Sequence, residues 1–292
     1  MELRWVTYFV AVAEAGTVSA AAEAVHVAQP SLSRQLRALE QDLKVDLFER
    51  AQGRLRLSPA GRALLPYARD VLAQVDDLRT AADLQVRGRL THVTIAAPTT
   101  TLTDVVSPFL VTLTPDDPVP AVFVSDGNTV DDALRRGADL VITADPPHPR
   151  LAFHPLPPLP VWAYVPPGHD RAGQPTVDLT ALAAEPLILL PPGHPARDAF
   201  DQTIGAPAAI EASNGTVAQA LAAAGRGIAV VSDDPRYDLV PLAVVTTDGT
   251  PVSVRLACAW NPRHPAAEAL ADLAARIEQY VVRRYPSRST RN

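Results

Sequence analysis

The sequence is poor in cysteine and has no long apolar run. Its 292 residues include a single cysteine, Cys258, which permits no intramolecular disulfide and no cysteine-based zinc site and agrees with a reducing compartment. No stretch of about 18 uninterrupted apolar residues occurs, and Glu2, Arg4 and Glu14 surround a short apolar start, so neither a membrane span nor a secretory signal is expected. We therefore expect a globular, cytoplasmic chain with no membrane partner.

Proline and charge divide the chain into two unlike parts. Only three of the 29 prolines precede residue 90, which predicts a helical N-terminal part and a remainder rich in strands, turns and loops. The formal net charge is −6, yet residues 29–69 carry eight basic and four acidic side chains, whereas residues 91–292 carry 14 basic and 21 acidic ones. The local basic surplus could face phosphate.

Apolar spacing predicts four helices in the N-terminal part, over residues 3–13 and 19–25, from residue 29 onward, and over residues 59–85. Proline opens the third and fourth helices, where the first amide would lack a helical partner anyway. The third helix is divided into two sides, with Leu32, Leu36, Leu39 and Leu43 on one and Arg34, Arg37 and Gln41 on the other. Alternation at 47–50 and 54–57 predicts a two-stranded wing.

Beyond residue 90, short apolar segments alternate with alanine-rich ones, which predicts a mixed α/β arrangement with helices covering sheets. The expected strands are residues 93–97, 121–125, 139–143, 187–190, 208–211, 228–231 and 252–259, and the expected helices are residues 101–113, 130–136, 216–224 and 265–282. Residues 283–292 form a basic tail, which we interpret as a frayed terminus.

Several motifs carry a resemblance to a known family. They are YFVAVAE at 8–14, HVAQPSLSRQL at 26–36, LFER at 47–50 and LSPAG at 57–61, with shorter matches RRGADLVI at 135–142 and AGRGIAVV at 224–231. Together these segments resemble the LysR-type transcriptional regulators over nearly the whole chain. One departure stands out, because residues 232–242 are compressed and contain Asp233, Asp234 and Pro235. We therefore expect a trimmed second lobe and a changed pocket wall.

The resemblance implies an α+β multidomain protein. A winged helix-turn-helix DNA-binding domain is expected at 1–58 and a long linker helix for dimerisation at 59–88. An effector-binding domain at 89–282, like the periplasmic binding proteins, would have one α/β lobe at about 91–160 plus 262–282 and another at 161–261. The implied partners are double-stranded promoter DNA, a small-molecule co-inducer, RNA polymerase and further copies of the chain in a homodimer or homotetramer.

The third helix is the expected reader of DNA sequence. In a helix-turn-helix, the N-terminal residues of the second motif helix lie against base edges in the major groove. Glutamine can bond an adenine edge in two places and arginine a guanine edge. The expected base-facing residues are Gln29, Ser31, Ser33 and Arg34, and Pro30, which opens the helix, is expected at the same DNA interface. The expected phosphate contacts are Arg37, Arg50, Arg54 and Arg56. The alternative is an ordinary solvated helix face.

The long helix from residue 59 has two interpretations. A narrow stripe of Val71, Val75, Leu78 and Ala82 steps by four, three and four residues, which is typical of a helix that pairs with a second copy. The alternative is a core helix of the C-terminal domain. Acidic and basic residues around the stripe favour pairing between subunits.

The expected effector site lies where strands end and helices begin, because free amides and the helix dipole at such places suit anions. The candidate residues are Thr99, Thr100, Thr101, Asn128 and Thr129 in one lobe and Pro192, Gly193 and His194 in the other. His194 or nearby Arg197 could pair a carboxylate. The alternative is simple helix capping, and no particular effector is implied.

Three other functions compete with this interpretation. An enzyme is disfavoured, since the glycines at 225–229 follow a helix instead of a strand and neither a G-x-S-x-G elbow nor a P-loop occurs. No cofactor, metal or catalytic residue is therefore expected. A solute-binding protein is disfavoured because it would need a signal for export, and no secretory signal is expected. A DNA-bending regulator that responds to no ligand remains the alternative to an effector-controlled one.

Overall fold

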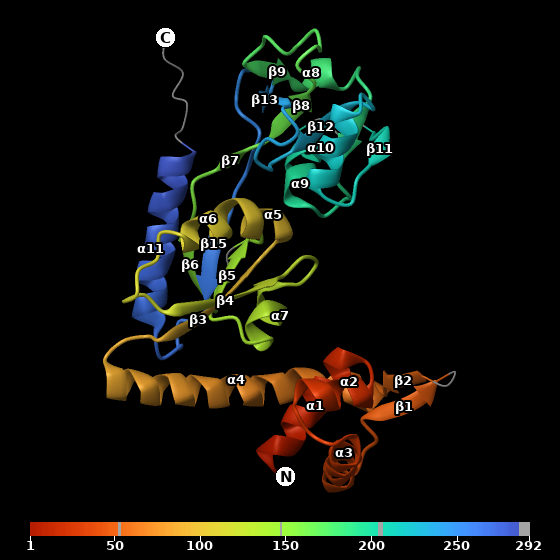
Figure 1. Ribbon diagram of the computed structural model, residues 1–292, viewed down its shortest axis with the longest axis vertical. Helices are drawn as coiled ribbons and strands as arrows, with labels where there is room; N and C mark the ends of the chain where they lie inside the picture. Colours follow the sequence, from red (N-terminus) through yellow and green to blue (C-terminus); the bar gives the residue numbers. More distant parts are fainter. Residues whose placement is uncertain (52–53, 147, 204–206, 286–292) are drawn as a thin grey trace. The chain divides into compact units, whose positions relative to one another are not determined.

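The computed structural model describes residues 1–51, 54–146, 148–203 and 207–285. The chain divides into two compact units, one comprising Met1–Leu90 with Asp131–Ala138 and the other Thr91–Val130 with Asp139–Asn292. Figure 1 labels their helices and strands. No single helix in the described ranges is long and apolar enough to cross a membrane, and only the bent pair of the first two helices meets that length and composition together.

The N-terminal unit is a small helical domain with a hairpin and one long helix. Thr17 caps its second helix by accepting a hydrogen bond from Ala20 N, and Gly16 ends the first in the left-handed conformation. Its elements are α1 (Leu3–Ala15), α2 (Val18–Ala24), α3 (Gln29–Leu43), β1 (Phe48–Ala51), β2 (Arg54–Leu57), α4 (Pro59–Arg87) and α7 (Val130–Arg135). The strands β1 and β2 pair in antiparallel register, as expected of a wing.

The core of this unit explains which side of α3 faces outward. Leu36 and Leu39 are buried with Phe9 of α1 and Leu47, which precedes β1. Leu43 does not belong to the buried stripe as expected, because it lies at the last position of α3 and is 37% exposed. The last helical turn therefore extends past the core.

The first lobe of the C-terminal unit is a five-stranded sheet in the order β4-β3-β5-β15-β6. Its β3 pairs in parallel with β4 and β5, and β15 pairs antiparallel with β5 and β6. The strands are β3 (His92–Ala97), β4 (Val119–Val124), β5 (Leu140–Thr143), β6 (Ala152–Pro155) and β15 (Ala257–Trp260), and the helices are α5 (Thr99–Thr101), the π-helical turn η1 (Leu102–Val106), α6 (Ser107–Leu110) and α11 (Ala267–Arg284). Figure 1 shows α11 running along this sheet, where it packs against β6 and β15.

The second lobe is a six-stranded sheet in the order β11-β10-β12-β8-β13-β9. Tyr164, Ile188 and Val231 are fully buried in its core. The strands are β8 (Trp162–Val165), β9 (Thr176–Asp178), β10 (Leu187–Leu189), β11 (Ile210–Glu211), β12 (Ile228–Val231) and β13 (Val240–Val245), and the helices are α8 (Leu179–Leu182), α9 (Pro195–Asp201) and α10 (Gly215–Ala223).

Two short strands connect the lobes. The pair of β7 (Leu159–Pro160) and β14 (Ser253–Val254) is antiparallel, and each strand lies between elements of different lobes along the chain. The single strand expected at 252–259 is therefore wrong: β14 ends at residue 254 and β15 joins the first lobe's sheet. Alternating and then continuous apolar residues on both sides of Arg255 hide this crossing, which places the return to the first lobe before residue 257 and not at 262.

Candidate functional site

The outward side of α3 presents unpaired polar side chains. Gln29, Arg34 and Arg37 are exposed, and neither arginine makes a hydrogen bond or ion pair with another residue in the described ranges. Ser31 and Ser33 are half-buried, and the Ser31 hydroxyl accepts a hydrogen bond from Gln35 at 3.4 Å. Pro30 is exposed at the first turn of α3. A helix whose arginines have no internal partner is free to use them on a ligand outside the chain.

Fewer of the basic groups around α3 are available to an outside ligand than the sequence suggests. Arg62 donates to the Leu57 carbonyl at 2.6 Å, and Arg69 pairs with Glu14 at 3.0 Å, so both guanidinium groups are held within the unit. Arg56 on β2 is exposed and has no partner among the residues that the structure describes. The side chains of Arg50 and Arg54, both expected at phosphates, lie outside the described part.

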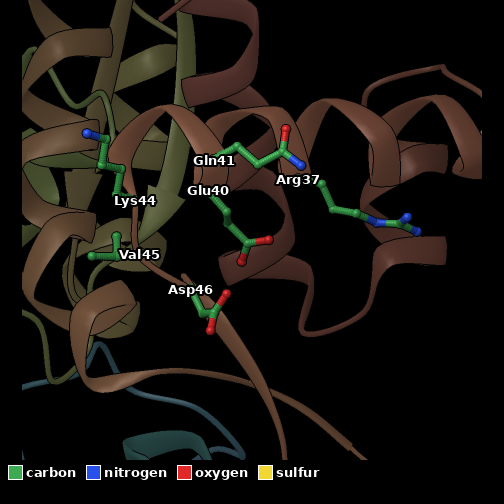
Figure 2. Close-up of a pocket in the computed structure, with 6 residues that line it drawn as sticks. All are labelled: Arg37, Glu40, Gln41, Lys44, Val45 and Asp46. Carbon is green, nitrogen blue, oxygen red and sulfur yellow. The ribbon is translucent and has the colours of Figure 1, made fainter.

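A shallow hollow of about 450 Å³ lies at the C-terminal half of α3. Figure 2 shows the six residues that line it, Arg37, Glu40, Gln41, Lys44, Val45 and Asp46. The Glu40 carboxylate accepts hydrogen bonds from Leu47 N at 2.8 Å and Phe48 N at 3.3 Å, which fixes the start of the wing relative to α3. Two cations and two carboxylates balance, so the hollow favours no net charge in a ligand.

The helix α4 carries an apolar stripe that the described part of the chain leaves largely exposed. Val71 is 41% and Leu78 70% exposed, while Ala82 is exposed and Val75 half-buried. Gly61 is the buried residue of this 29-residue helix. At about 1.5 Å per residue the helix is roughly 44 Å long, and its contacts within its own unit include α1 and the wing strand β2.

A small cavity lies between the two lobes of the C-terminal unit. It measures about 20 Å³, room for about one water, and its lining includes the predicted effector residues Thr100, Thr101 and His194. Burial lowers the pKa of the His194 imidazole, whose Nδ1 accepts a hydrogen bond from Ala196 N at 3.4 Å. The lining residues come from the first lobe (Pro98, Thr100, Thr101, Asp104, Val105, Leu256, Tyr285), the second lobe (His194, Pro195, Ser232) and the connecting strands (Leu159, Val254).

The other predicted effector residues do not line this cavity. Thr99 donates to Asp126 through its backbone amide at 2.8 Å and through its hydroxyl, and the Asn128 side chain donates to the Asp126 carbonyl. Thr129 and Pro192 are exposed. Arg197 is paired with Asp201 at 2.6 Å and with the Leu190 carbonyl, so its guanidinium has structural partners.

A larger, open hollow lies on another side of the lobe connection. It measures about 680 Å³, and predicted residue Gly193 contributes to it. The Gly193 amide donates to Asp198 at 2.9 Å, which ties the loop to α9. The lining residues with polar side chains are Asp145, Asp198, Gln202, Thr203, Thr246, Thr250, Ser253 and Arg255.

Sequence reasoning missed the polar cluster that joins the lobes beside the small cavity. The buried carboxylate of Asp104, on η1, accepts hydrogen bonds from Asp234 N at 3.0 Å and from the Arg236 guanidinium at 2.9 Å. The Tyr285 hydroxyl donates to Asp234 at 2.9 Å, and Arg284 pairs with the same carboxylate. The available signal was the segment 232–242, which carries Asp234 and Arg236 of this cluster.

Burial dominates the electrostatics of this cluster. It raises the pKa of the Asp233 carboxyl to about 6, and the nearby charge of Asp104 adds to the rise. Burial also raises the pKa of Asp104, although the Asp234 amide opposes the shift. Thr100 donates to Asp233 Oδ1 at 3.4 Å across the lobes, whereas the buried Oδ2 atom has no hydrogen-bond partner in the described chain.

Within the described residues, no group of three or more histidine, cysteine, aspartate or glutamate side chains could hold a metal ion. The Cys258 thiol is fully buried, and burial raises its pKa. A thiol in such a place is held in its unreactive protonated form.

Two family models match the chain. The LysR substrate binding domain matches residues 87–280, and the bacterial regulatory helix-turn-helix protein, lysR family, matches residues 3–62. A "probable hydrogen peroxide-inducible genes activator" of Mycobacterium avium is 33% identical over 260 residues, covering 87% of this chain and 82% of the relative. For the regulator ClcR of Pseudomonas putida, 42% identity over 96 residues covers only 33% of each chain, so the matched segment spans far less than two thirds of that relative.

Solved structures show the same two-part architecture. A full-length OxyR variant from Pseudomonas aeruginosa matches with a TM-score of 0.70 and 25% identity, covering 95% of this chain and 94% of that chain. CbnR in complex with its target DNA matches with a TM-score of 0.67 and 27% identity, covering 97% and 99%. The predicted combination of an N-terminal helix-turn-helix with a C-terminal α/β substrate domain is confirmed.

Proposed function

The chain belongs to the LysR family of transcriptional regulators, and from this premise we propose that it binds promoter DNA through α3 and the wing under the control of a small molecule held between its lobes. The observation that carries the DNA-binding part is the outward side of α3. Its Arg34 and Arg37 are exposed and have no partner in the described chain, within the segment that matches the family's helix-turn-helix.

The residues of this surface divide into two roles. Gln29, Arg34 and the half-buried Ser31 and Ser33 lie in the first turns of α3, where base edges would come within reach. Arg37 follows about one turn later, and Arg56 lies on the wing. We assign these two arginines, with Arg50 and Arg54, to phosphate contacts that set affinity without reading sequence.

The stripe on α4 is proposed as the contact between subunits. Val71, Leu78 and Ala82 expose apolar surface that has no cover within the described chain. Antiparallel pairing with the same helix of a second copy would bury it and present two α3 helices to a two-fold related DNA site. A homodimer is the simplest assembly, and a homotetramer would add a second pair. The DNA-bound assembly would then contact RNA polymerase at the promoter.

The effector is proposed to bind between the lobes, near Thr100, Thr101 and His194. A cavity of about 20 Å³ is too small for a metabolite, since small-molecule sites occupy roughly 300–1,000 Å³. Binding therefore requires the lobes to separate at this place. Thr99, Asn128, Thr129, Pro192 and Gly193 stand at the neighbouring strand ends and would form the rim of the opened site.

The response named for the mycobacterial relative is not proposed here. Thiol-based peroxide sensing needs a reactive, accessible thiolate. The single cysteine of this chain, Cys258, is fully buried in β15 with its pKa raised by burial. A reversibly bound small molecule, and not oxidation of a thiol, is therefore the proposed signal.

The closed cavity also favours a second candidate function, a DNA-bending regulator that responds to no ligand. Thermal unfolding of the purified protein with a panel of small carboxylic acids, amino acids and amines distinguishes the two. A ligand that binds the folded chain raises its midpoint temperature in proportion to its occupancy. If no compound shifts either the midpoint or the DNA bend, the ligand-independent function is favoured.

The DNA-binding proposal is tested by comparing two arginine variants on sequences selected from a random duplex pool. Arg34→Ala should cost roughly 1–3 kcal/mol on the selected sequence and relax discrimination at one position. Arg37→Ala should weaken selected and random DNA alike and lower the slope of affinity with salt by about one charge.

The matched control is Arg263→Ala, which removes one positive charge from an exposed residue of the C-terminal unit. It should leave both affinities unchanged. If Arg34→Ala and Arg263→Ala lose DNA affinity equally, or if neither α3 variant changes DNA affinity, the surface of α3 is not part of the DNA interface.

A further inference from the structure

The two lobes are held together by a polar cluster that uses one short segment of the second lobe. We propose that Asp233–Arg236 acts as an internal clasp, which grips the first lobe and keeps the site between the lobes closed when no small molecule is bound. The first-lobe partners of this clasp are Thr100, Asp104, Arg284 and Tyr285.

The first half of the grip centres on Asp104. Its carboxylate receives the Arg236 guanidinium at 2.9 Å and the Asp234 amide at 3.0 Å, so one buried acidic group takes two donors from the other lobe. Asp104 is only 7% exposed. Because a buried carboxylate that loses its donors is costly, separating the lobes here requires water or a ligand to replace both donors.

In the second half of the clasp, the roles of the two lobes as donor and acceptor are exchanged. Here the second lobe supplies the carboxylate, Asp234, and the first lobe supplies the donors, the Tyr285 hydroxyl at 2.9 Å and the Arg284 guanidinium. Each lobe thus contributes both an acceptor and an arginine. Because the donors and acceptors alternate between the lobes, these contacts hold the lobes together and also allow only one relative position of the two.

The clasp is rigid within its own lobe before it meets the other. Gln219 of α10 is fully buried and accepts a hydrogen bond from Arg236 N at 2.7 Å while donating to the Asp234 carbonyl at 2.9 Å. A Cβ on Gly215 would lie about 2.1 Å from the Asp233 carboxyl group, so glycine makes room for it. The segment is therefore already in position, and little conformational entropy is lost when the lobes close.

Closure by the clasp accounts for the small size of the cavity beside it. Only about 20 Å³ remains between Thr100, His194 and Tyr285. If the proposed effector control holds, a small molecule must break the clasp to enter, and the strength of the clasp sets the threshold for the response. The clasp itself does not depend on that function, and its test needs neither DNA nor ligand.

The test measures how often the lobes open, by the rate at which a buried thiol reacts. Thr101 is 5% exposed and lines the cavity, so Thr101→Cys places a thiol behind the clasp. The natural Cys258 contributes little background, because it is fully buried. Reaction with an aromatic disulfide reagent is followed in the full-length protein, where the rate tracks the population of open molecules when closure is fast.

Adding Arg236→Ala to Thr101→Cys should speed labelling roughly tenfold or more, the factor expected when a buried charge-assisted hydrogen bond is lost. The matched control is Glu185→Ala, which breaks the 3.3 Å pair with Arg171 inside the second lobe and should leave the rate unchanged. Tyr285→Phe is the milder second variant, since it removes only the hydroxyl donor to Asp234, and it should also speed labelling.

The proposal is overturned if both clasp variants label at the rate of Thr101→Cys alone, or if Glu185→Ala accelerates labelling as much as they do. Thermal unfolding of each variant is recorded in parallel. A variant with a large loss of overall stability is then set aside in favour of Tyr285→Phe, whose result decides. An absent response to small molecules would weaken the proposed effector control while leaving the labelling result intact.

Discussion

The raised pKa of Asp233 predicts that this residue makes the protein more stable as the pH falls. The perturbation is Asp233→Asn, which keeps the size and the acceptor for Thr100 but removes the titrating group. Burial raises the pKa of Asp233 to about 6 in the folded chain, against an ordinary value of 3.8. A group that binds its proton more tightly in the folded state adds stability as the pH drops through that interval.

The magnitude follows from the size of the shift. Above pH 7 the carboxylate is charged in both states, and the folded state carries the cost of burying it. At about 1.36 kcal/mol for each pKa unit, full protonation would relieve roughly 3 kcal/mol, of which about 1.4 kcal/mol should appear by pH 5. Asp233→Asn lacks this gain. Between pH 7.5 and pH 5, the unfolding free energy of the wild type should therefore rise by about 1.4 kcal/mol relative to that of Asp233→Asn.

The assay is urea unfolding of both proteins at pH 7.5, 6.5, 5.5 and 5.0, using a probe in the second lobe such as the Trp162 fluorescence. The control is Asp170→Asn, which removes a carboxylate from an exposed position and should follow the wild type at every pH. A difference between wild type and Asp233→Asn that stays constant within about 0.5 kcal/mol over this range would refute the assignment of a raised pKa to Asp233.

Three further changes test other parts of the structure. Gly61→Ala should destabilise the N-terminal unit by about 1–3 kcal/mol in thermal unfolding, because its Cβ would lie 2.0 Å from the Leu47 carbonyl oxygen; an unchanged midpoint would contradict this packing. Leu78→Glu should weaken self-association roughly tenfold or more in sedimentation, as a charge enters the proposed apolar contact, whereas Thr80→Glu on the other side of α4 should not. Hydrogen peroxide should leave the Cys258 thiol unmodified by mass spectrometry and DNA affinity unchanged, and sulfenic acid at Cys258 would count against the buried environment.

The N-terminal unit was largely predictable because its signals are local. Gly16 ends α1, Thr17 caps α2, and Pro30 and Pro59 open α3 and α4 at the positions expected of each residue type. Ser58 adds a contact that spacing could not reveal, since its hydroxyl both caps Gly61 N at 2.9 Å and donates to the Asp46 carbonyl at 2.6 Å. Local rules therefore find the elements, while the contacts that join them depend on the folded chain.

The lobes were harder to predict where the chain changes sheet. The expected strands leave out the proline-rich residues 155–166, yet these contain β7 and β8, and Pro160 tolerates its position because the β7–β14 pair is short. The largely apolar segment 252–259 was predicted as one strand, although the chain crosses between lobes inside it. Apolar composition reports burial, and it cannot distinguish which of two sheets buries a strand.

The predicted effector residues show the same division between local and distant contacts. Placing polar residues at strand ends identified Thr100, Thr101 and His194, all of which line the inter-lobe cavity. Thr99 satisfied the same rule, but its amide and hydroxyl are both taken by Asp126, a neighbour at the end of the adjacent strand. Position relative to a strand end thus predicts proximity to the cavity, whereas the partners of each side chain decide whether it is available.

The clasp lies beyond any local rule, because Asp104 and Asp234 are 130 residues apart in sequence. Asp104 on a helix and Asp233 in a turn would each pass as a solvated carboxylate, and only the closed lobes turn them into buried, interacting groups. The segment 232–242 was nevertheless the right place to look, since the buried carboxylates of an acidic turn must be matched by hydrogen-bond donors elsewhere. Those donors, Arg284 and Tyr285, come at the very end of α11, where sequence alone suggests a frayed terminus. The end of that helix is better understood as the first lobe's half of the clasp.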